Sequence, residues 1–431
     1  MSIYTQEGIA VARRIWRQFW SPEYKHFRTQ GKTAETIGAW NGYTVWAYLI
    51  GLEAILEAEK SAPGMFRAEI QEALFEMEQH WSPDYGAYCA WIYFKGNGDI
   101  YMDDNAQIAI LLLLAHRLLP PPVGLPYRSY IERASQVVDF CLTGWDKTNG
   151  GGIRWHVSAD GPPWTNRNAC STSLTAVAVL ELASVLRDGG VSNTDKQVRG
   201  LVDWGRKCVD WVWEKLVVGN GDGLVLDGLV QKQKGGPWVI ERPTYTYNTG
   251  HTITALVLLY DLLLPGDPWA PTVRLRANSL VILSIDRTKG LYDKTVPNLQ
   301  QRYWWDNNFF VHLLVEGLVV WGMRFGYEDN DLWKQVRGEI QRQMNYLMTY
   351  LRDKDDGLYW RNFRLYTISM GHLRVYKTLT GDVGRQPELD AAEVRQDDQS
   401  MALPVTQREL VKTLLGCGGA GRSLCIAGRV F

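Results

Sequence analysis

The sequence has no pattern that would hold a metal ion or a resident cofactor. Its six cysteines are spread over 431 residues, and none of them forms a CxxC pair. The seven histidines are scattered, without an HxxxH spacing or a Cys/His cluster. The glycine-rich stretch at 219–223 lacks the context of a phosphate-binding loop. We therefore expect a protein that uses neither a metal nor a cofactor.

The sequence also lacks an excess of charge of either sign. Its 46 Lys and Arg residues nearly balance 47 Asp and Glu residues. Nucleic acids and anionic membranes require a basic face, so neither is expected as a partner. The longest apolar run, residues 108–115, is too short to span a membrane. The first twenty residues read as an amphipathic helix rather than a signal peptide. These features favour a cytoplasmic protein with reduced thiols and leave its oligomeric state open.

Aromatic residues are abundant, with 19 Trp, 21 Tyr and 11 Phe. They indicate a groove that binds sugars or flat apolar molecules, or else dense packing between many helices. Composition alone does not choose between these two interpretations.

A short turn pattern repeats along the chain. Each copy has a glycine-containing turn, then an apolar residue, then an aromatic or extended residue. The steps between the glycines of five copies are 66, 71, 67 and 67 residues, for Gly86, Gly152, Gly223, Gly290 and Gly357. A degenerate first copy, Trp20–Phe27, shares its Trp-Ser-Pro-acid-Tyr opening with the copy that begins at Trp81. The pattern therefore predicts six structural repeats.

Each interval between turns has room for two helices. Six segments carry their charges on one face and are predicted to be amphipathic helices: 6–19, 66–80, 127–141, 195–215, 271–285 and 331–351. Six alternating segments are apolar nearly all round and are predicted to be buried helices: 44–58, 104–119, 169–186, 249–264, 308–324 and, more weakly, 366–378. This alternation describes two concentric rings. The predicted fold is thus an all-α (α/α)6 barrel, formed by residues 1–380 as a single domain. Residues 381–431 are predicted to be an irregular tail, because the pattern ends there and 416–423 is rich in glycine.

Polar and aromatic residues recur where the predicted inner helices begin, so the fold would gather them around one mouth. The candidate ligand contacts of this kind are Trp40, Asn41, Asn168, Tyr247, Asn248, Trp305 and Asn307. Each amide taken alone is better explained as a helix N-cap. Together, amides that bond hydroxyl groups and aromatic faces that pack on sugar C–H surfaces predict a carbohydrate cleft.

Asp103 and Asp104 are the adjacent carboxylates in this set of helix starts. Hydrolysis of a glycosidic bond needs one carboxylic acid to protonate the leaving oxygen. It also needs a second carboxylate that acts as a nucleophile or activates water. Side chains of neighbouring residues diverge at a helix start, so the separations of retaining and inverting enzymes are both within reach. Mutual repulsion raises one pKa of such a pair, as a general acid requires.

Several motifs occur in an order that resembles a known family. They are Tyr101-Met-Asp-Asp104, Gly144-Trp-Asp146, Gly150-Gly-Gly-Ile-Arg-Trp155, Arg167-Asn-Ala169 with Ser171, and Thr246-Tyr-Asn-Thr-Gly250. Spread over roughly residues 40–325, they are similar to the motifs of glycoside hydrolase family 76, the endo-α-1,6-mannanases. The tandem aspartate and the GGGI-x-W stretch are fairly specific together.

The resemblance implies an (α/α)6 barrel that hydrolyses α-mannosidic linkages with retention and without a cofactor. Asp103 would be the nucleophile and Asp104 the general acid/base. Asn168, Tyr247 and Asn248 would line the cleft, and Trp155 could stack on a sugar ring.

Two other functions stay open at this point. A cytoplasmic tailoring enzyme of small-molecule metabolism, such as an isomerase or cyclase, could use the same barrel with a carboxyl as general acid. It is motivated by the missing leader and by the residues that follow two motifs, Asn105-Ala-Gln107 and Thr249. A non-catalytic sugar-binding protein is the third possibility, and its binding would survive loss of both carboxylates.

Overall fold

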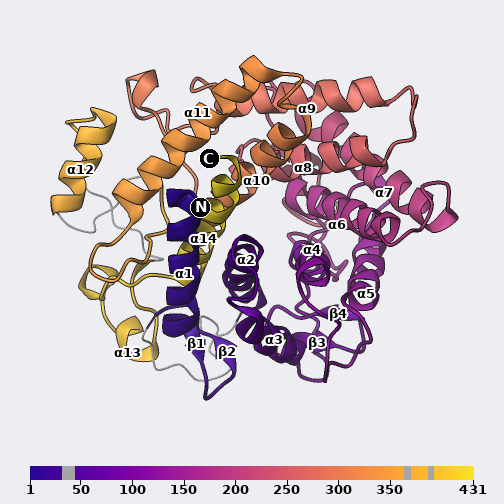
Figure 1. The fold of residues 1–431 in the computed structure, drawn as a ribbon, viewed down its shortest axis with the longest axis horizontal. Coiled ribbons are helices and arrows are strands. Elements are labelled where there is room, and N and C mark those ends of the chain that lie inside the picture. Colours follow the sequence, from indigo (N-terminus) through magenta and orange to yellow (C-terminus); the bar gives the residue numbers. More distant parts are fainter. Residues whose placement is uncertain (32–43, 364–369, 387–392) are drawn as a thin grey trace. The chain divides into compact units, whose positions relative to one another are not determined.

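The computed structural model describes residues 1–31, 44–363, 370–386 and 393–431, and these are mostly helical (Figure 1). The helices are α1 (Ile3–Phe19), α2 (Val45–Ser61), α3 (Arg67–Glu76), α4 (Met102–Leu118), α5 (Tyr130–Thr143), α6 (Ala169–Asp188), α7 (Lys196–Val212), α8 (Thr246–Leu262), α9 (Ala270–Ile285), α10 (Asn308–Phe325), α11 (Asn330–Tyr346), α12 (Met370–Thr380), α13 (Asp398–Met401) and α14 (Leu414–Ala427). The strands are β1 (Trp20–Ser21), β2 (His26–Phe27), β3 (Trp81–Ser82), β4 (Ala87–Tyr88), β5 (Arg167–Asn168), β6 (Gly228–Gln231) and β7 (Trp238–Glu241).

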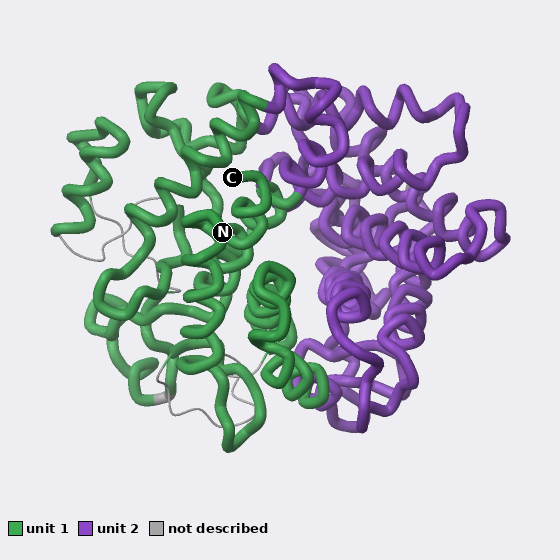
Figure 2. Tube along the Cα trace, viewed as in Figure 1, with its two compact units in different colours: residues 1–76, 285–316, 334–431 green, residues 77–284, 317–333 purple. Residues whose placement is uncertain are grey.

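The chain forms two compact units (Figure 2). Unit 1 contains residues 1–76, 285–316 and 334–431, and unit 2 contains residues 77–284 and 317–333. Both ends of the chain therefore belong to unit 1. The expectation that residues 1–380 act as a single domain stays a prediction.

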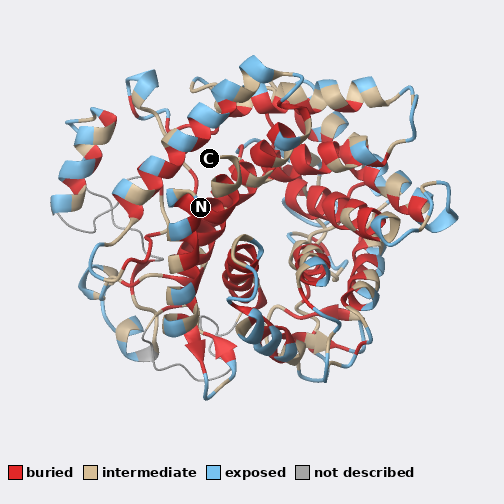
Figure 3. Ribbon diagram, in the orientation of Figure 1, coloured by how far each residue is buried: buried red, intermediate tan, exposed pale blue. Residues whose placement is uncertain are grey.

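The predicted alternation of helices is confirmed as far as residue 351, because every predicted segment up to that point coincides with one of the helices α1 to α11. Helices α2, α4, α6 and α8 are buried on almost every side, whereas α1 and α7 bury one face each (Figure 3). In unit 2, α6 packs against both α4 and α8. Apolar side chains on all faces of a helix require such neighbours.

The repeated turns are attached to the N-termini of the buried helices. In unit 2, Asn105 in the first turn of α4 accepts a hydrogen bond from the Tyr88 backbone N–H and donates to the Tyr88 carbonyl. In unit 1, Asn308 at the start of α10 donates in the same way to the carbonyl of Trp360. Each turn is thus held beside the helix start that carries the polar cluster.

The two Trp-Ser-Pro copies form matching hairpins. Trp20 pairs with Phe27 in the first, and Trp81 pairs with Tyr88 in the second. Gly86 has a φ of 64°, and the equivalent Lys25 has a φ of 50°. That left-handed conformation suits glycine, so the degenerate copy keeps the backbone of the repeat with a less suitable residue.

The structure corrects the prediction of an irregular C-terminal tail. Residues 414–427 form the buried helix α14, which packs against α1 and α2 in unit 1. Its glycines allow close approach: a Cβ on Gly418 would lie 2.6 Å from the Ile50 carbonyl oxygen, and one on Gly419 would lie 2.5 Å from the Phe309 Cα. Glycine here removes steric bulk between helices instead of loosening the chain.

The same observation changes the assignment of the sixth buried helix. The weakly predicted segment 366–378 overlaps α12, which has exposed positions on several sides, and residues 364–369 lie outside the described residues. Helix α14 has the all-round burial that was expected of 366–378.

A buried charge network connects α14 to its neighbours in unit 1. Arg422 is 3% exposed. Its guanidinium group lies 2.9 and 3.0 Å from the two carboxylate oxygens of Glu316 on α10, and 3.5 Å from Glu53 on α2. A buried charge needs partners of this kind, so the network fixes the register of α14.

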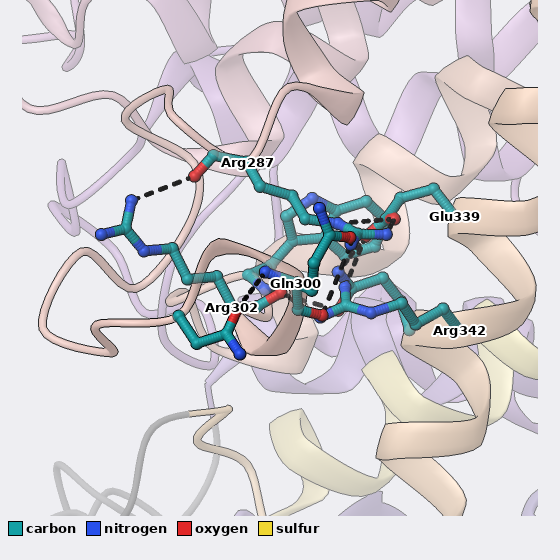
Figure 4. A network of polar contacts seen from close by, with 8 residues as sticks. Arg287, Gln300, Arg302, Glu339 and Arg342 are labelled. Atoms are coloured by element: carbon teal, nitrogen blue, oxygen red, sulfur yellow. Dashed lines mark hydrogen bonds and ion pairs between the residues drawn. The ribbon is translucent and has the colours of Figure 1, made fainter. Parts of the chain in front are cut away.

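A second polar network in unit 1 holds the loop after α9 against α11 (Figure 4). Glu339, which is 4% exposed, accepts hydrogen bonds from Arg287 at 2.7 Å and from Arg342 at 2.7 Å. Arg342 also donates to the carbonyl of Arg302, and Arg287 donates to the side chain of Gln300. The loop that leads to Trp305 therefore has a defined path.

Two described helices, α6 and α10, are long and apolar enough to cross a membrane by length and composition. In each case most of the apolar window is buried inside the structure, 83% for α6 and 72% for α10. The apolar side chains of both helices are therefore covered mostly by protein.

Candidate active site

The predicted catalytic pair, Asp103 and Asp104, lies in the first turn of α4 in unit 2. Both side chains are half-buried, whereas the flanking Met102 and Asn105 are fully buried. The first turn of a helix presents unpaired backbone N–H groups and the positive end of the helix dipole, which favours a carboxylate.

Asp103 accepts hydrogen bonds from three other residues. Its Oδ1 accepts from the backbone N–H of Asp104 at 3.1 Å. Its Oδ2 accepts from Nε1 of Trp155 at 3.1 Å and from the Cys170 thiol at 3.4 Å. Burial raises the pKa of Asp103, and these donors oppose that rise because they stabilise the ionised form.

Asp104 lies in a different environment. Burial raises the pKa of Asp104 well above its ordinary value, and the negative charges of Asp103 and then Asp99 raise it further. Among the described residues, no hydrogen-bond donor opposes this rise. The pKa of Asp104 is thus raised without opposition, whereas hydrogen-bond donors oppose the rise at Asp103.

A cluster of aromatic side chains lies on one side of the Asp103 carboxylate. Trp155 stacks on Trp164, with ring centroids 5.9 Å apart, and contacts Tyr101 at 5.0 Å. His156 lies 4.5 Å from Trp164 and 4.9 Å from Tyr101, centroid to centroid, and is 5% exposed. Trp155 is thus both an aromatic surface beside the pair and a hydrogen-bond donor to it.

A third carboxylate, Asp227, holds two of the predicted contact residues. Its Oδ1 accepts hydrogen bonds from the Tyr247 hydroxyl at 2.9 Å and from Nδ2 of Asn248 at 3.0 Å, both from the start of α8. Burial raises the pKa of Asp227, and these two donors oppose the rise. The Asp227 backbone carbonyl accepts from the N–H of Ala169 at 2.8 Å, so it lies beside the start of α6.

Asn168 occupies the N-cap position of α6 at the end of strand β5. It pairs with Gly228 of β6, the residue after Asp227. A Cβ on Gly228 would lie 3.0 Å from Oδ1 of Asn168. Asn168 does not use its side chain as a cap, which leaves the amide available to a ligand.

Part of this constellation is predictable from the sequence, and the rest is not. Asp103, Trp155, Asn168, Tyr247 and Asn248 come together at the starts of α4, α6 and α8. Asp227 and Cys170 were not predicted. The one sequence signal for Asp227 was its position four residues after Gly223, the glycine of a repeated turn. Cys170 directly follows the motif Arg167-Asn-Ala169.

The remaining candidates lie in unit 1 or outside the described residues. Trp305 and Asn307 belong to unit 1, where Nε1 of Trp305 donates to the Gly290 carbonyl at 2.7 Å and Asn307 forms a backbone bridge with Asn362. Trp40 and Asn41 lie outside the described residues. Their role in ligand binding stays a prediction. Within the described part of the chain, no group of three or more His, Cys, Asp or Glu side chains is arranged to hold a metal ion.

Comparison with known proteins agrees with the motifs at this site. The model of glycosyl hydrolase family 76 matches residues 5–361. The chain belongs to glycosyl hydrolase family 76. Membership places it among the glycoside hydrolases, as the sequence motifs predicted.

One relative of this family 76 member is a fission yeast protein. The chain is 32% identical, over its whole length, to the "Meiotically up-regulated gene 191 protein" of Schizosaccharomyces pombe, and it covers 93% of that protein. That name describes expression and not an activity.

Solved structures of family 76 share the fold. An α-1,6-mannanase from a Salegentibacter species has a TM-score of 0.69 at 15% identity, over 99% of both chains. A family 76 mannosidase from Bacteroides thetaiotaomicron has a TM-score of 0.68 at 17% identity, over 100% of both chains. Another solved structure is that of an inactive variant of the Salegentibacter enzyme in complex with α-1,6-mannotriose. In this variant, two consecutive aspartates are changed to asparagine. The predicted all-α (α/α)6-barrel fold is confirmed by this likeness.

Proposed function

We propose that this chain hydrolyses α-1,6-linked mannosides with retention of configuration, with Asp103 as the nucleophile and Asp104 as the general acid/base. The observation that carries the proposal is the split environment of the two carboxyl groups. Asp103 accepts hydrogen bonds from Trp155, Cys170 and a backbone N–H, whereas desolvation and two neighbouring carboxylates raise the pKa of Asp104.

The first step uses both protonation states. The carboxyl of Asp104 donates its proton to the glycosidic oxygen while the carboxylate of Asp103 attacks the anomeric carbon. The bond to the leaving sugar breaks, and a glycosyl-enzyme ester forms on Asp103. This ester removes the negative charge from Asp103, so the pKa of Asp104 falls at the moment when a base is needed.

The second step regenerates the enzyme. Asp104, now a carboxylate, takes a proton from water as the water oxygen attacks the anomeric carbon. The ester bond to Asp103 breaks, and the released sugar has the configuration of the substrate. Both carboxyl groups then return to their starting protonation states.

The surroundings of the pair suit a sugar ring. Trp155 offers an aromatic face, and Asn168 and Asp227 offer groups that hydrogen-bond hydroxyls. The substrate is proposed by analogy with the Salegentibacter enzyme, whose variant with two adjacent aspartates replaced binds α-1,6-mannotriose. This chain belongs to the same family and has a tandem aspartate at the start of α4. We therefore expect it to act on a related linkage.

Release of reducing sugar from α-1,6-mannan tests the activity. The wild-type chain should release sugar, and Asp103→Asn and Asp104→Asn should each lose nearly all of this activity. Asp139→Asn, a change to an exposed carboxylate on α5 of the same unit, is the matched control and should remain active. Absence of release by the wild type, or activity in both active-site variants, would contradict the proposal.

Azide separates the roles of the two carboxylates. A small nucleophile should rescue Asp104→Ala with a mannosyl azide of retained configuration, because the Asp103 ester still forms. It should rescue Asp103→Ala with an inverted azide, because azide then attacks the substrate directly. The opposite pairing of variant and anomer, read by proton NMR, would exchange the two assignments.

A further inference from the structure

One thiol of this chain contacts the candidate nucleophile directly. Cys170 is the second residue of α6, and its Sγ lies 3.4 Å from Oδ2 of Asp103 on α4. The side chain is 8% exposed. Cys89, Cys141 and Cys417 bond to backbone carbonyl oxygens instead. Cys170 therefore differs from these three thiols, because its acceptor is a carboxylate.

The chemistry of the two groups sets the direction of this bond. An ionised carboxylate only accepts hydrogen bonds, so the thiol must donate. Burial raises the pKa of the Cys170 thiol well above its usual value, and the charges of Asp103 and Asp227 raise it further. The thiol therefore keeps its proton. Since the reactive form of cysteine is the thiolate, Cys170 itself is a poor nucleophile.

We propose that Cys170 is a positioning residue, which together with Trp155 saturates Oδ2 of Asp103 and leaves Oδ1 as the oxygen that attacks the anomeric carbon. A carboxylate oxygen has two lone-pair directions. Oδ2 accepts hydrogen bonds from two side chains, whereas Oδ1 accepts one from the backbone N–H of Asp104. The inference rests on the proposed role of Asp103 as nucleophile.

A thiol suits this position because it is a weak donor. Strong charge-assisted donors shorten the bond to a carboxylate and stabilise its negative charge. A second donor as strong as the indole N–H would lower the basicity of the carboxylate that must attack. The S–H group fixes the orientation of Oδ2 at a smaller cost in nucleophilicity.

Three variants separate positioning from packing. Cys170→Ala removes the donor, and Cys170→Ser keeps a donor on a shorter side chain. Cys141→Ala is the matched control: Cys141 is also a fully buried thiol in unit 2, and it bonds to the Met102 carbonyl at the start of α4 without touching the carboxylate. Packing alone would make the two alanine variants alike.

The pH dependence of kcat/KM on α-1,6-mannan is the first readout. The acidic limb reports protonation of the nucleophile in the free enzyme. Loss of the S–H donor should move this limb of Cys170→Ala to higher pH by about half a unit, with kcat reduced about fivefold and KM little changed. Cys170→Ser should lie closer to the wild type. A Cys170→Ala profile that superimposes on the wild type, or an equal shift in Cys141→Ala, would overturn the proposal.

The S–H stretching band gives a readout that needs no substrate. The infrared difference between the wild type and Cys170→Ala isolates the band of this thiol. In Asp103→Asn the band should move to higher frequency, because an amide oxygen is a weaker acceptor than a carboxylate. An unchanged band would contradict the bond itself. If the wild type cleaves no mannan but the band shifts, the proposed function fails while the contact between thiol and carboxylate stands.

Discussion

Asp103 and Asp104 are neighbours in the chain, but their side chains meet different surroundings. The Asp103 carboxylate lies among donors from α6 and from the loop before it, whereas Asp104 faces the carboxylates of Asp103 and Asp99. Adjacent residues at a helix start point in different directions, so one helix turn supplies two chemically distinct carboxyl groups. In the proposed mechanism, this separation supplies an acid and a nucleophile at the same pH.

Trp155 offers a test of the donor role at the residue scale. Trp155→Phe keeps an aromatic ring against Tyr101 and Trp164 but loses the N–H that donates to Asp103. We expect kcat on α-1,6-mannan to fall about tenfold, with the melting temperature nearly unchanged. The matched control is Trp164→Phe, which changes the stacking partner of Trp155 without removing a bond to Asp103. Equal losses in the two variants would show that ring packing alone matters.

Asp104 should reduce the stability of the fold at neutral pH. Its pKa is raised in the folded state, so the folded protein binds this proton more tightly than the unfolded chain does. The resulting stabilisation is present below the ordinary pKa of aspartate and is lost as the pH rises through the raised value. Asp104→Asn removes this dependence.

We therefore expect Asp104→Asn to become more stable than the wild type as the pH rises from about 4 to about 8, by on the order of 1 kcal/mol at the upper end. Melting temperatures across this range check the prediction, with Asp203→Asn, at an exposed position on α7 of the same unit, as the surface control. A difference that shrinks with rising pH would have the wrong sign.

The residues of the candidate site that stand in a local motif could be proposed from the sequence. Asp103 and Asp104 stand next to each other, and Trp155, Asn168 and Tyr247 lie in recognisable stretches. The contact between Cys170 and Asp103 joins residues 67 positions apart. Such a contact depends on how α4 and α6 pack, and no periodicity within either helix encodes it.

At the scale of elements, α14 shows why composition can mislead. The segment Gly416-Cys-Gly-Gly-Ala-Gly421 reads as flexible, because glycine disfavours a helix in isolation. In unit 1 the same glycines let α14 approach the backbones of α2 and α10 closely. Tertiary packing outweighs helix propensity in such a case. Repeat length and amphipathic period were enough to predict α1 to α11, whose hydrophobic patterns agree with their environments.

Two alanine substitutions test this explanation. A Cβ on Gly419 would lie 2.5 Å from the Phe309 Cα and 2.6 Å from the Asn308 carbonyl oxygen, so backbone would have to move. Gly419→Ala should lower the free energy of unfolding by about 3 kcal/mol. Gly338 in α11 has open space where a Cβ would lie, so Gly338→Ala should raise the free energy of unfolding by about 0.5–1 kcal/mol through helix propensity. Shifts of opposite sign in the two melting temperatures would support the packing argument, and stabilisation in both would refute it.

At the scale of the whole molecule, unit 1 is assembled from both ends of the chain. Helix α14 packs against α1 and α2, and the hydroxyl of Ser2 donates to the Gly428 carbonyl at 3.4 Å. The rings of Tyr4 and Phe431 lie 5.3 Å apart, in an edge-to-face contact. The stability of unit 1 therefore depends on contacts between residues that are far apart in the sequence, such as Ser2 and Gly428.

This arrangement predicts that folding requires α14. It does not require the order in which the elements follow one another along the chain. Deleting residues 414–431 uncovers apolar faces of α1 and α2 and leaves Glu53 and Glu316 without Arg422. We expect the deleted protein to be largely insoluble, or to bind a hydrophobic dye without a cooperative melting transition.

A circular permutant is the matched control for this deletion. It joins Phe431 to Met1 through a short glycine-serine linker and opens the chain before Val123, which is 92% exposed in the loop after α4. Because Met1 and Phe431 belong to the same unit, where residues near them are in contact, and the new ends fall in an exposed loop, the permutant should stay soluble and melt cooperatively near the wild-type temperature. A soluble, cooperatively folded deletion variant would contradict the role of α14. The permutant keeps every residue that the deletion removes. If both proteins fail to fold, any change at the two ends of the chain is therefore destabilising, whether or not α14 is present.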